Sequence, residues 1–128
     1  MIYILQVNFP IDGPFGQEMS TQFADLAKSI NEEPGFLWKI WTENADEKEA
    51  GGIYAFDSYE NAENYLNMHS ERLKSMGVPS VNAKIFATND TLTKITHGRL
   101  TYPNLNDKIQ LAFQCTQKKC VLKGFFRH

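Results

Sequence analysis

The feature that most constrains the fold of this chain is a Pro-Gly pair, Pro34 and Gly35, followed directly by the aromatic run Phe36-Leu-Trp-Lys-Ile-Trp41. Proline cannot continue the hydrogen-bond ladder of a helix, and glycine readily adopts the left-handed conformation that caps one. The segment therefore predicts the end of a helix and the start of a strand. Both tryptophans of the protein lie in that strand.

Large side chains are expected on both faces of this strand, because successive residues of a strand point to opposite sides. One face is expected to carry Phe36, Trp38 and Ile40, and the other Leu37, Lys39 and Trp41. A sheet that is aromatic on both faces needs a cover on each. Its own helices can cover one face, and a partner is expected to cover the other.

Three further segments have the pattern of strands. Residues 2–9 and 81–88 alternate in polarity, and residues 51–56 form a short apolar run that begins with a pair of glycines. The glycines indicate a bulge or a close approach of two backbones. Residues 44–49 are polar and predict a turn between the tryptophan strand and the strand at 51–56.

Two segments have the apolar spacing of amphipathic helices. The first is expected to be capped by Asp12, with Pro14 in its first turn and an apolar face formed by Phe15, Met19, Phe23, Leu26 and Ile30. The second has capping-box spacing at Asp57 and Glu60, a stop at Gly77, and a stripe formed by Ala62, Leu66, His69, Leu73 and Met76. A short helix over residues 90–98, capped by Asp90, is expected to follow.

The resulting order, βαββαβ, is typical of an α+β, ferredoxin-like fold. Such a fold places two helices on one face of a four-stranded antiparallel sheet and leaves the second face bare. That bare face is expected to be apolar, so a two-fold homodimer that packs sheet on sheet is predicted.

Several stretches resemble one known family. They are Ile11-Asp-Gly-Pro-Phe-Gly16, the run Ser29-Ile-Asn-Glu-Glu-Pro-Gly-Phe-Leu-Trp-Lys-Ile-Trp-Thr-Glu43, and Glu49-Ala-Gly-Gly-Ile-Tyr-Ala-Phe56. From about residue 5 to about residue 97 the chain is similar to the YdhR-type mono-oxygenases. These belong to the dimeric α/β-barrel superfamily, which also holds the antibiotic-biosynthesis mono-oxygenases. The resemblance implies the ferredoxin-like fold and a dimeric barrel.

Composition and charge separate a main domain, residues 1–98, from a basic C-terminal extension, residues 99–128. Residues 1–90 carry 14 acidic and 6 basic side chains, whereas residues 91–128 carry 1 acidic and 7 basic ones. The extension is expected to be either an extra hairpin or a poorly ordered appendage. Its charge could contact an acidic partner or fold back on the acidic domain. Nucleic acid is not expected as a partner, because no basic stripe interleaves with exposed aromatic residues.

Residue usage also bears on location and on metals. No segment approaches the roughly 18 to 20 apolar residues of a membrane span. The N-terminal apolar run lacks the basic region of a signal peptide, and the chain has two cysteines. A reducing cytoplasm is therefore the expected location. Cys115 and Cys120 offer only two metal ligands, so no metal site is expected.

The candidate catalytic residues are His69, Asn8 and Tyr65. His69 is the one titratable group on its helix stripe, so it is a candidate general base or an inert histidine at the edge of the core. Tyr65 lies one helical turn earlier and is expected on the same pocket wall. Asn8, on the first strand, could orient a substrate oxygen or bond a backbone group.

The candidate substrate-binding residues are the aromatic side chains of the two central strands, Trp38, Trp41, Tyr54 and Phe56. Such a cluster either lines an apolar pocket for a flat substrate or forms core and dimer interface.

The resemblance implies a cofactor-independent mono-oxygenase that acts on a small, electron-rich aromatic metabolite, such as a phenol, quinol or anthrone. The deprotonated substrate itself supplies electrons to oxygen, so no cofactor is expected. Some members of the superfamily degrade haem with an Asn on the first strand and a Trp and a His on the second helix. Here Tyr65 and Ser75 stand at those helix positions, which departs from that pattern. The alternative function is a non-catalytic dimer that binds a small apolar ligand.

Overall fold

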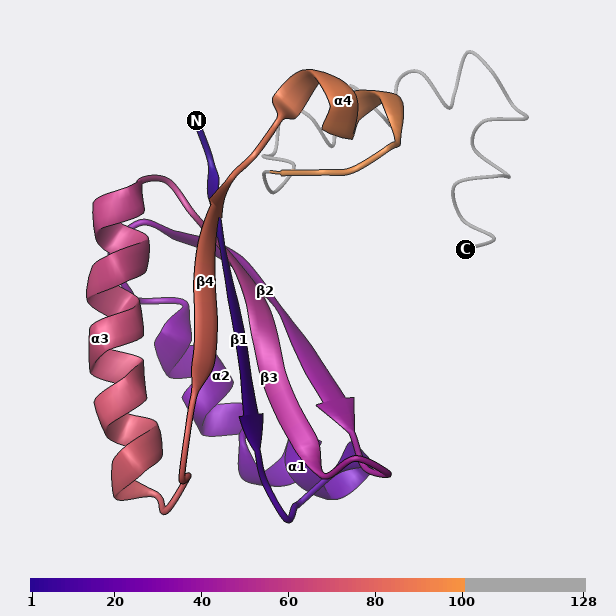
Figure 1. The fold of residues 1–128 in the computed structure, drawn as a ribbon, viewed down its shortest axis with the longest axis vertical. Helices are drawn as coiled ribbons and strands as arrows, with labels where there is room; N and C mark the ends of the chain where they lie inside the picture. The colour runs from indigo at the N-terminus through magenta and orange to yellow at the C-terminus, as the bar shows by residue number, and fades with distance from the viewer. Residues whose placement is uncertain (101–128) are drawn as a thin grey trace.

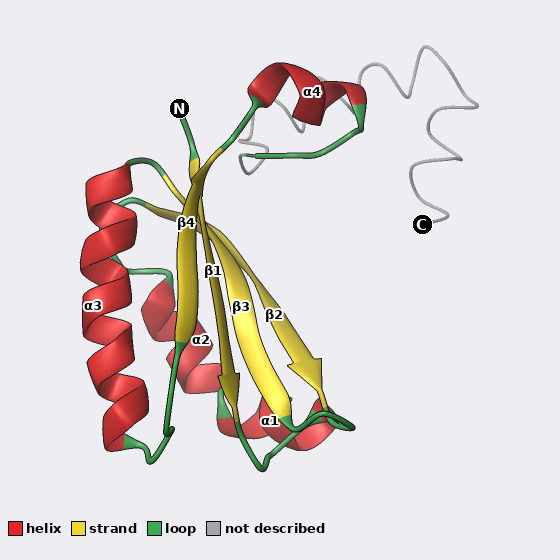
Figure 2. Ribbon diagram, viewed as in Figure 1, coloured by secondary structure: helices red, strands yellow, loops and turns green. Residues whose placement is uncertain are grey.

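The computed structural model describes residues 1–100, which form one sheet with helices packed against it (Figures 1 and 2). The order along the chain is βααββαβα. The strands are β1 (Tyr3–Pro10), β2 (Phe36–Asn44), β3 (Glu49–Phe56) and β4 (Asn82–Ala87), and the helices are α1 (Gly16–Gln22), α2 (Ala24–Ile30), α3 (Tyr59–Ser75) and α4 (Asp90–Ile95).

The four strands form one antiparallel sheet in the order β2-β3-β1-β4. Helices α1, α2 and α3 cover one face of this sheet, and α3 contacts β1, β3 and β4 (Figure 1). Helix α4 stands beyond the end of the sheet (Figure 2). The predicted ferredoxin-like α+β fold is confirmed.

The core lies between the sheet and the helices. Side chains that alternate along β1 and β3 point towards α3 because of the two-residue period of a strand. Burial of their apolar surface stabilises the fold by about 25 cal/mol per Å². The fully buried cluster consists of Leu5, Val7, Ile30, Tyr54, Phe56, Ala62 and Tyr65.

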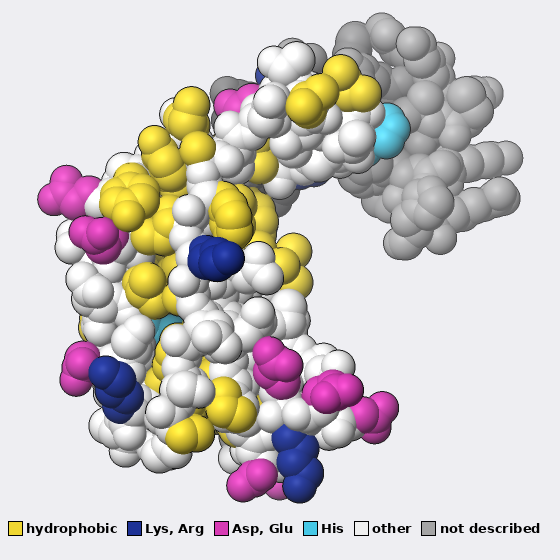
Figure 3. Space-filling view, in the orientation of Figure 1, with side chains coloured by type: hydrophobic (Ala, Val, Ile, Leu, Met, Phe, Trp, Pro, Cys, Tyr) yellow, Lys and Arg dark blue, Asp and Glu magenta, His cyan; other side chains and the backbone are white. Residues whose placement is uncertain are grey.

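The opposite, outer face of the sheet has no helix in the part of the chain that the structure describes (Figure 2). The register pairs Ile4 with Ala55 and Phe86, and Ile40 with Ile53, on this face. Ile40 is 55% exposed and Phe86 is 47% exposed. In Figure 3, hydrophobic side chains reach the surface over the upper part of β4 and β1, and acidic ones surround the β2–β3 turn.

A bulge in β2 changes the predicted alternation. Phe36 pairs with Phe56, but the next pair is Trp38 with Ala55, so the register shifts between Phe36 and Trp38. Trp38 and Trp41 lie on opposite faces, as expected, because Trp41 pairs with Gly52. The prediction that Phe36 shares the face of Trp38 was wrong: the extra residue turns Phe36 towards the core, where its ring packs edge-on against Phe56.

The first predicted helix is two short helices, because the backbone leaves the helical conformation at Phe23 (φ −103°, ψ 9°). Its N-cap is Phe15 and makes no side-chain cap, so the cap predicted at Asp12 was wrong. The Gly16 N–H instead donates to Glu43 Oε1 at 2.7 Å, which ties the start of α1 to β2.

The caps of the later helices each lie one residue from the predicted position. The Ser58 hydroxyl caps α3 by accepting from the Asn61 N–H at 3.1 Å, while Asp57 accepts from the Asn61 side chain. The Asn89 side chain, not Asp90, caps α4 by accepting from the Leu92 N–H. Serine and asparagine are favoured at N-caps because their short side chains reach the free N–H groups.

None of the helices in the described residues is long and apolar enough to cross a membrane. The predicted C-terminal extension lies outside the described residues from position 101 onward, and so do Cys115 and Cys120. The division of the chain at residue 98 stays a prediction.

Candidate functional site

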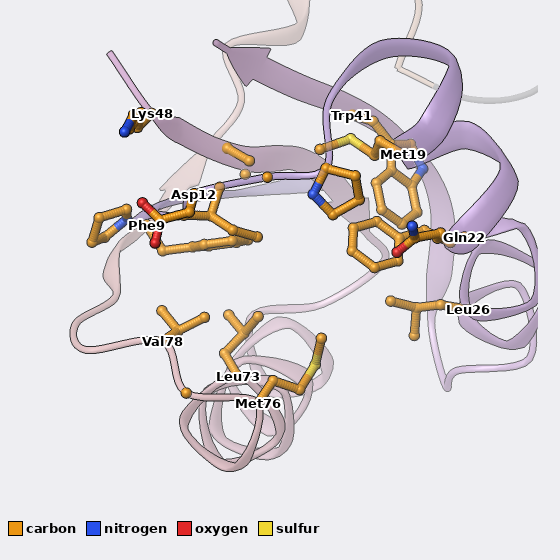
Figure 4. A pocket seen from close by; sticks show the side chains of 18 of the residues that line it. Phe9, Asp12, Met19, Gln22, Leu26, Trp41, Lys48, Leu73, Met76 and Val78 are labelled. Carbon is orange, nitrogen blue, oxygen red and sulfur yellow. The ribbon is translucent and has the colours of Figure 1, made fainter. Parts of the chain in front are cut away.

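A cavity of about 620 Å³ lies between the sheet and the helices. Figure 4 shows Trp41, Met19, Gln22 and Leu26 on one side of it and Leu73, Met76 and Val78 on the facing side. The walls come from the β1–α1 loop, α1, the α1–α2 junction, β2, β3 and the C-terminal half of α3. The lining is mainly apolar, as in small-molecule sites.

The break between α1 and α2 shapes one wall of this cavity. Phe23, at the break, stacks on Trp41 with ring centroids 6.3 Å apart. Met19 is buried and Leu26 is half-buried beside them. A continuous helix through residue 23 would change the direction of these side chains, so the irregularity helps to position the wall.

Lys39 is the charged residue that β2 places in the cavity. It pairs with Tyr54 and therefore faces the helices. Its Nζ lies 3.3 Å from the centroid of a Trp41 ring and 4.6 Å from that of the Tyr54 ring. Burial, together with the positive charge of Arg72, lowers the pKa of Lys39 to about 7. Lys39 can therefore accept a proton near neutral pH, and its ammonium form suits the faces of the aromatic rings.

A hydrogen-bonded network on α3 and β3 borders the cavity. Arg72 Nη2 donates to His69 Nδ1 at 2.8 Å and to the Tyr65 hydroxyl at 3.1 Å. His69 Nε2 lies 3.4 Å from the Tyr54 hydroxyl, which also accepts from the Tyr65 hydroxyl at 3.5 Å. Of these four residues, His69 and Arg72 line the cavity, whereas Tyr54 and Tyr65 lie in the core behind them.

This network fixes the protonation of His69. Arginine only donates, so His69 Nδ1 is an acceptor and the ring proton sits on Nε2, facing the Tyr54 hydroxyl. His69 is 4% exposed, and burial, followed by the charges of Arg72 and Lys39, lowers its pKa to about 3. Burial likewise raises the pKa of Tyr54 and of Tyr65. All three side chains are therefore neutral at pH 7.

The structure brings together only part of the predicted site. Trp41 and His69 line the cavity, and Tyr65 and Tyr54 reach it indirectly through the network. Phe56 is fully buried in the core.

Two predicted site residues lie away from the cavity. Asn8 faces the outer side of β1, opposite Leu5 and Val7. Trp38 also faces outward, and its indole N–H donates to the Leu100 carbonyl at 2.9 Å. The roles predicted for these residues stay predictions.

Lys39 and Arg72 are the site residues that the sequence interpretation missed. A signal was present for each. Lys39 sits between two aromatic residues and on the same strand face as Trp41. Arg72 follows His69 by three positions, so it projects from the same side of α3.

Among residues 1–100, no group of three or more His, Cys, Asp and Glu side chains is placed to hold a metal ion.

A model of the family described as "Putative mono-oxygenase ydhR" matches residues 4–99 of the chain. The chain belongs to this ydhR family. The match runs from the second residue of β1 to beyond the end of α4, and it includes every residue that lines the cavity. No curated protein sequence matches the chain.

Two solved structures are similar to this ydhR-family protein. One is a mutant of SnoaB, a cofactor-independent oxygenase from Streptomyces nogalater, with a TM-score of 0.50 and 16% identity over 69% of this chain and 93% of that chain. The other is a monooxygenase from the gene ActVA-Orf6 of Streptomyces coelicolor in complex with nanaomycin D, with a TM-score of 0.48 and 21% identity over 68% and 87%. At 16% identity, the likeness to SnoaB concerns the fold alone.

Proposed function

We propose that this ydhR-family protein is a cofactor-independent mono-oxygenase that oxidises a small, electron-rich aromatic metabolite in the cavity beside Trp41. The observation that carries the proposal is the cavity itself. It is apolar, walled by aromatic side chains, and contains a lysine whose pKa is lowered to about 7. Membership of a family described as mono-oxygenases supports the class of reaction.

The reaction needs a base and a dry pocket. Neutral Lys39 Nζ takes the proton of the substrate hydroxyl or acidic C–H, so that bond breaks and an N–H bond forms. The resulting anion gives electrons to molecular oxygen, one oxygen atom enters the product, and the other leaves as water. For an anthrone, loss of two hydrogens and gain of one oxygen yields the quinone.

In this proposal His69 is a positioning residue and not the base. Both of its ring nitrogens face hydrogen-bond partners, and its pKa of about 3 makes it a weak proton acceptor at neutral pH. Its contact with Arg72 holds the guanidinium beside the cavity.

The proposal includes a homodimer formed through the outer face of the sheet and a cytoplasmic location. The exposed apolar side chains of β2 and β4 on that face support the dimer. The alternative function, a non-catalytic dimer that binds a small ligand, uses the same cavity.

Oxygen uptake by the purified protein tests the proposal, with a panel of phenols, quinols and anthrones and a chelator present. We expect uptake to rise with pH through about 7, because the base acts in its neutral form. Lys39→Met should slow turnover by roughly 10² or more. Lys94→Met is the control, since Lys94 is an exposed lysine of α4, which lies beyond the end of the sheet and does not line the cavity (Figure 2). Uptake no faster than the spontaneous rate for every compound would favour the ligand-binding alternative.

A further inference from the structure

The inner part of the cavity holds two basic groups, Lys39 and Arg72, and within residues 1–100 neither forms an ion pair with a carboxylate. In the described part of the chain, the only side-chain ion pair within 4.0 Å joins Lys74 to Glu71 on the exposed side of α3. Arg72 Nε is buried and has no hydrogen-bond partner there. Both side chains are half-buried, and partial burial of a charge without a counter-ion is costly, because the loss of hydration is not offset by attraction.

The other charged groups around the cavity do not supply this counter-ion. Asp12, Glu47 and Lys48 also line it, but all three side chains are exposed, and neither carboxylate forms an ion pair with Lys39 or Arg72. His69, Tyr54 and Tyr65 are held neutral by burial. Glu33, whose charge also raises the pKa of Tyr65, forms no ion pair with Arg72 within 4.0 Å. The inner end of the cavity therefore carries a net positive charge.

The hydrogen bonds of Arg72 hold its guanidinium in place. Its Nη2 is fixed by His69 and Tyr65, both of which are buried. Because these acceptors are neutral, they do not offset the positive charge of Arg72, which can still attract an anionic ligand. Lys39 approaches from the opposite wall, on β2, over the ring of Trp41.

We propose that the cavity binds an aromatic ligand as its anion, with an anionic oxygen of the ligand placed between Lys39 and Arg72. This rests on the proposed function in so far as it concerns the same cavity, and it narrows the substrate class to acidic aromatics. The anion supplies the counter-charge that residues 1–100 do not provide, and Trp41 and Phe23 offer flat apolar surface to the ring. The oxygen can belong to an ionised phenol or to a carboxylate.

Binding without oxygen tests this inference separately from turnover. The probes are a nitronaphthol, whose ionised form is coloured, and its methyl ether, which has the same ring and no acidic proton. Under nitrogen, we expect saturable binding of the nitronaphthol with an increase in the colour of the anion at fixed pH. The methyl ether should bind at least about tenfold more weakly, because it cannot supply the charge.

The pair of variants is Lys39→Met and, as its control, Lys94→Met. Lys39→Met should weaken nitronaphthol binding by about tenfold and abolish the colour change, while leaving the methyl ether unaffected. Lys94→Met should bind like wild type. Arg72→Lys keeps the positive charge but lacks the planar guanidinium. This variant should therefore retain the colour change but bind the nitronaphthol more weakly than wild type.

A naphthoate and its neutral naphthamide separate the two sources of the anionic oxygen. Tighter binding of the naphthoate than of the naphthamide, lost in Lys39→Met, assigns a carboxylate. Tighter binding of the nitronaphthol than of its methyl ether, with no difference between the naphthoate and the naphthamide, assigns a phenol oxygen.

Equal binding of the charged and neutral members of both pairs would overturn the inference, as would nitronaphthol binding that is unchanged in Lys39→Met. Oxygen uptake together with equal binding of the charged and neutral probes would leave the proposed function standing and remove the inference. Anion binding without oxygen uptake would support the inference and remove the proposed function.

Discussion

At the scale of single residues, His69 shows how surroundings change the chemistry that a residue type suggests. Its unperturbed pKa makes histidine the usual candidate for a base at neutral pH. Here burial and two nearby cations lower that pKa to about 3, whereas burial and the charge of Arg72 bring the pKa of Lys39 down to about 7. Lys39 is therefore the residue whose pKa suits a general base at neutral pH.

The lowered pKa of His69 predicts a loss of stability in acid. The unfolded chain takes up a proton on this side chain near pH 6.5, and the folded chain resists until about pH 3. The free energy of unfolding should therefore fall between pH 6.5 and pH 3, by on the order of 4 kcal/mol from this residue. Urea denaturation of wild type and His69→Gln across this range measures it. A pH dependence as steep in His69→Gln as in wild type would contradict the assignment.

At the scale of elements, the glycine pair in β3 sets how closely its neighbours approach. A Cβ on Gly51 would overlap the backbone carbonyl of Val7 on the adjacent strand. A Cβ on Gly52 would lie 2.5 Å from Lys39 Cε, the flexible end of a side chain. The backbone of β1 cannot move aside without breaking the ladder, but the lysine can.

The two alanine substitutions should therefore differ. Gly51→Ala should lower the free energy of unfolding by about 2 to 3 kcal/mol through overpacking. Gly52→Ala should cost less than about 1 kcal/mol but displace Lys39, so it should weaken binding of the nitronaphthol anion. Urea denaturation and the colour assay measure both effects. Equal destabilisation by the two variants would show that β1 and β3 adjust as readily as the lysine does.

At the scale of the whole molecule, the outer face of the sheet and the cavity lie on opposite sides of the same strands. Successive residues of β2 serve the two sides, with Lys39 and Trp41 in the cavity and Trp38 and Ile40 facing outward. A dimer through the outer face would bury apolar side chains without covering the helix side.

Ile40→Asp tests this assembly. A buried, unpaired carboxylate on each subunit should shift the protein from dimer to monomer in sedimentation velocity. Met68→Asp is the control, because Met68 is an exposed apolar residue on α3, on the helix side. A wild-type protein that sediments as a monomer at every concentration would refute the dimer.

The sequence by itself determined the order of the strands and helices, because hydrophobic period, Pro34-Gly35 and the capping residues act over short distances along the chain. It placed the N-caps of α1, α3 and α4 within three residues and put Trp38 and Trp41 on opposite faces. It missed the break at Phe23 and the bulge after Phe36, since both depend on how each segment packs against neighbours remote in sequence.

The candidate site was decided mainly by the tertiary structure. Trp41 and His69 could be selected as aromatic and titratable residues on apolar faces, but the same reasoning selected Asn8 and Trp38, which point away from the cavity. From its residue type alone, His69 was predicted as the candidate general base. Only the folded chain brings Lys39 from β2 and Arg72 from α3 to one cavity. Burial and the nearby charge of Arg72, which together lower the pKa of Lys39, are properties of that arrangement in space.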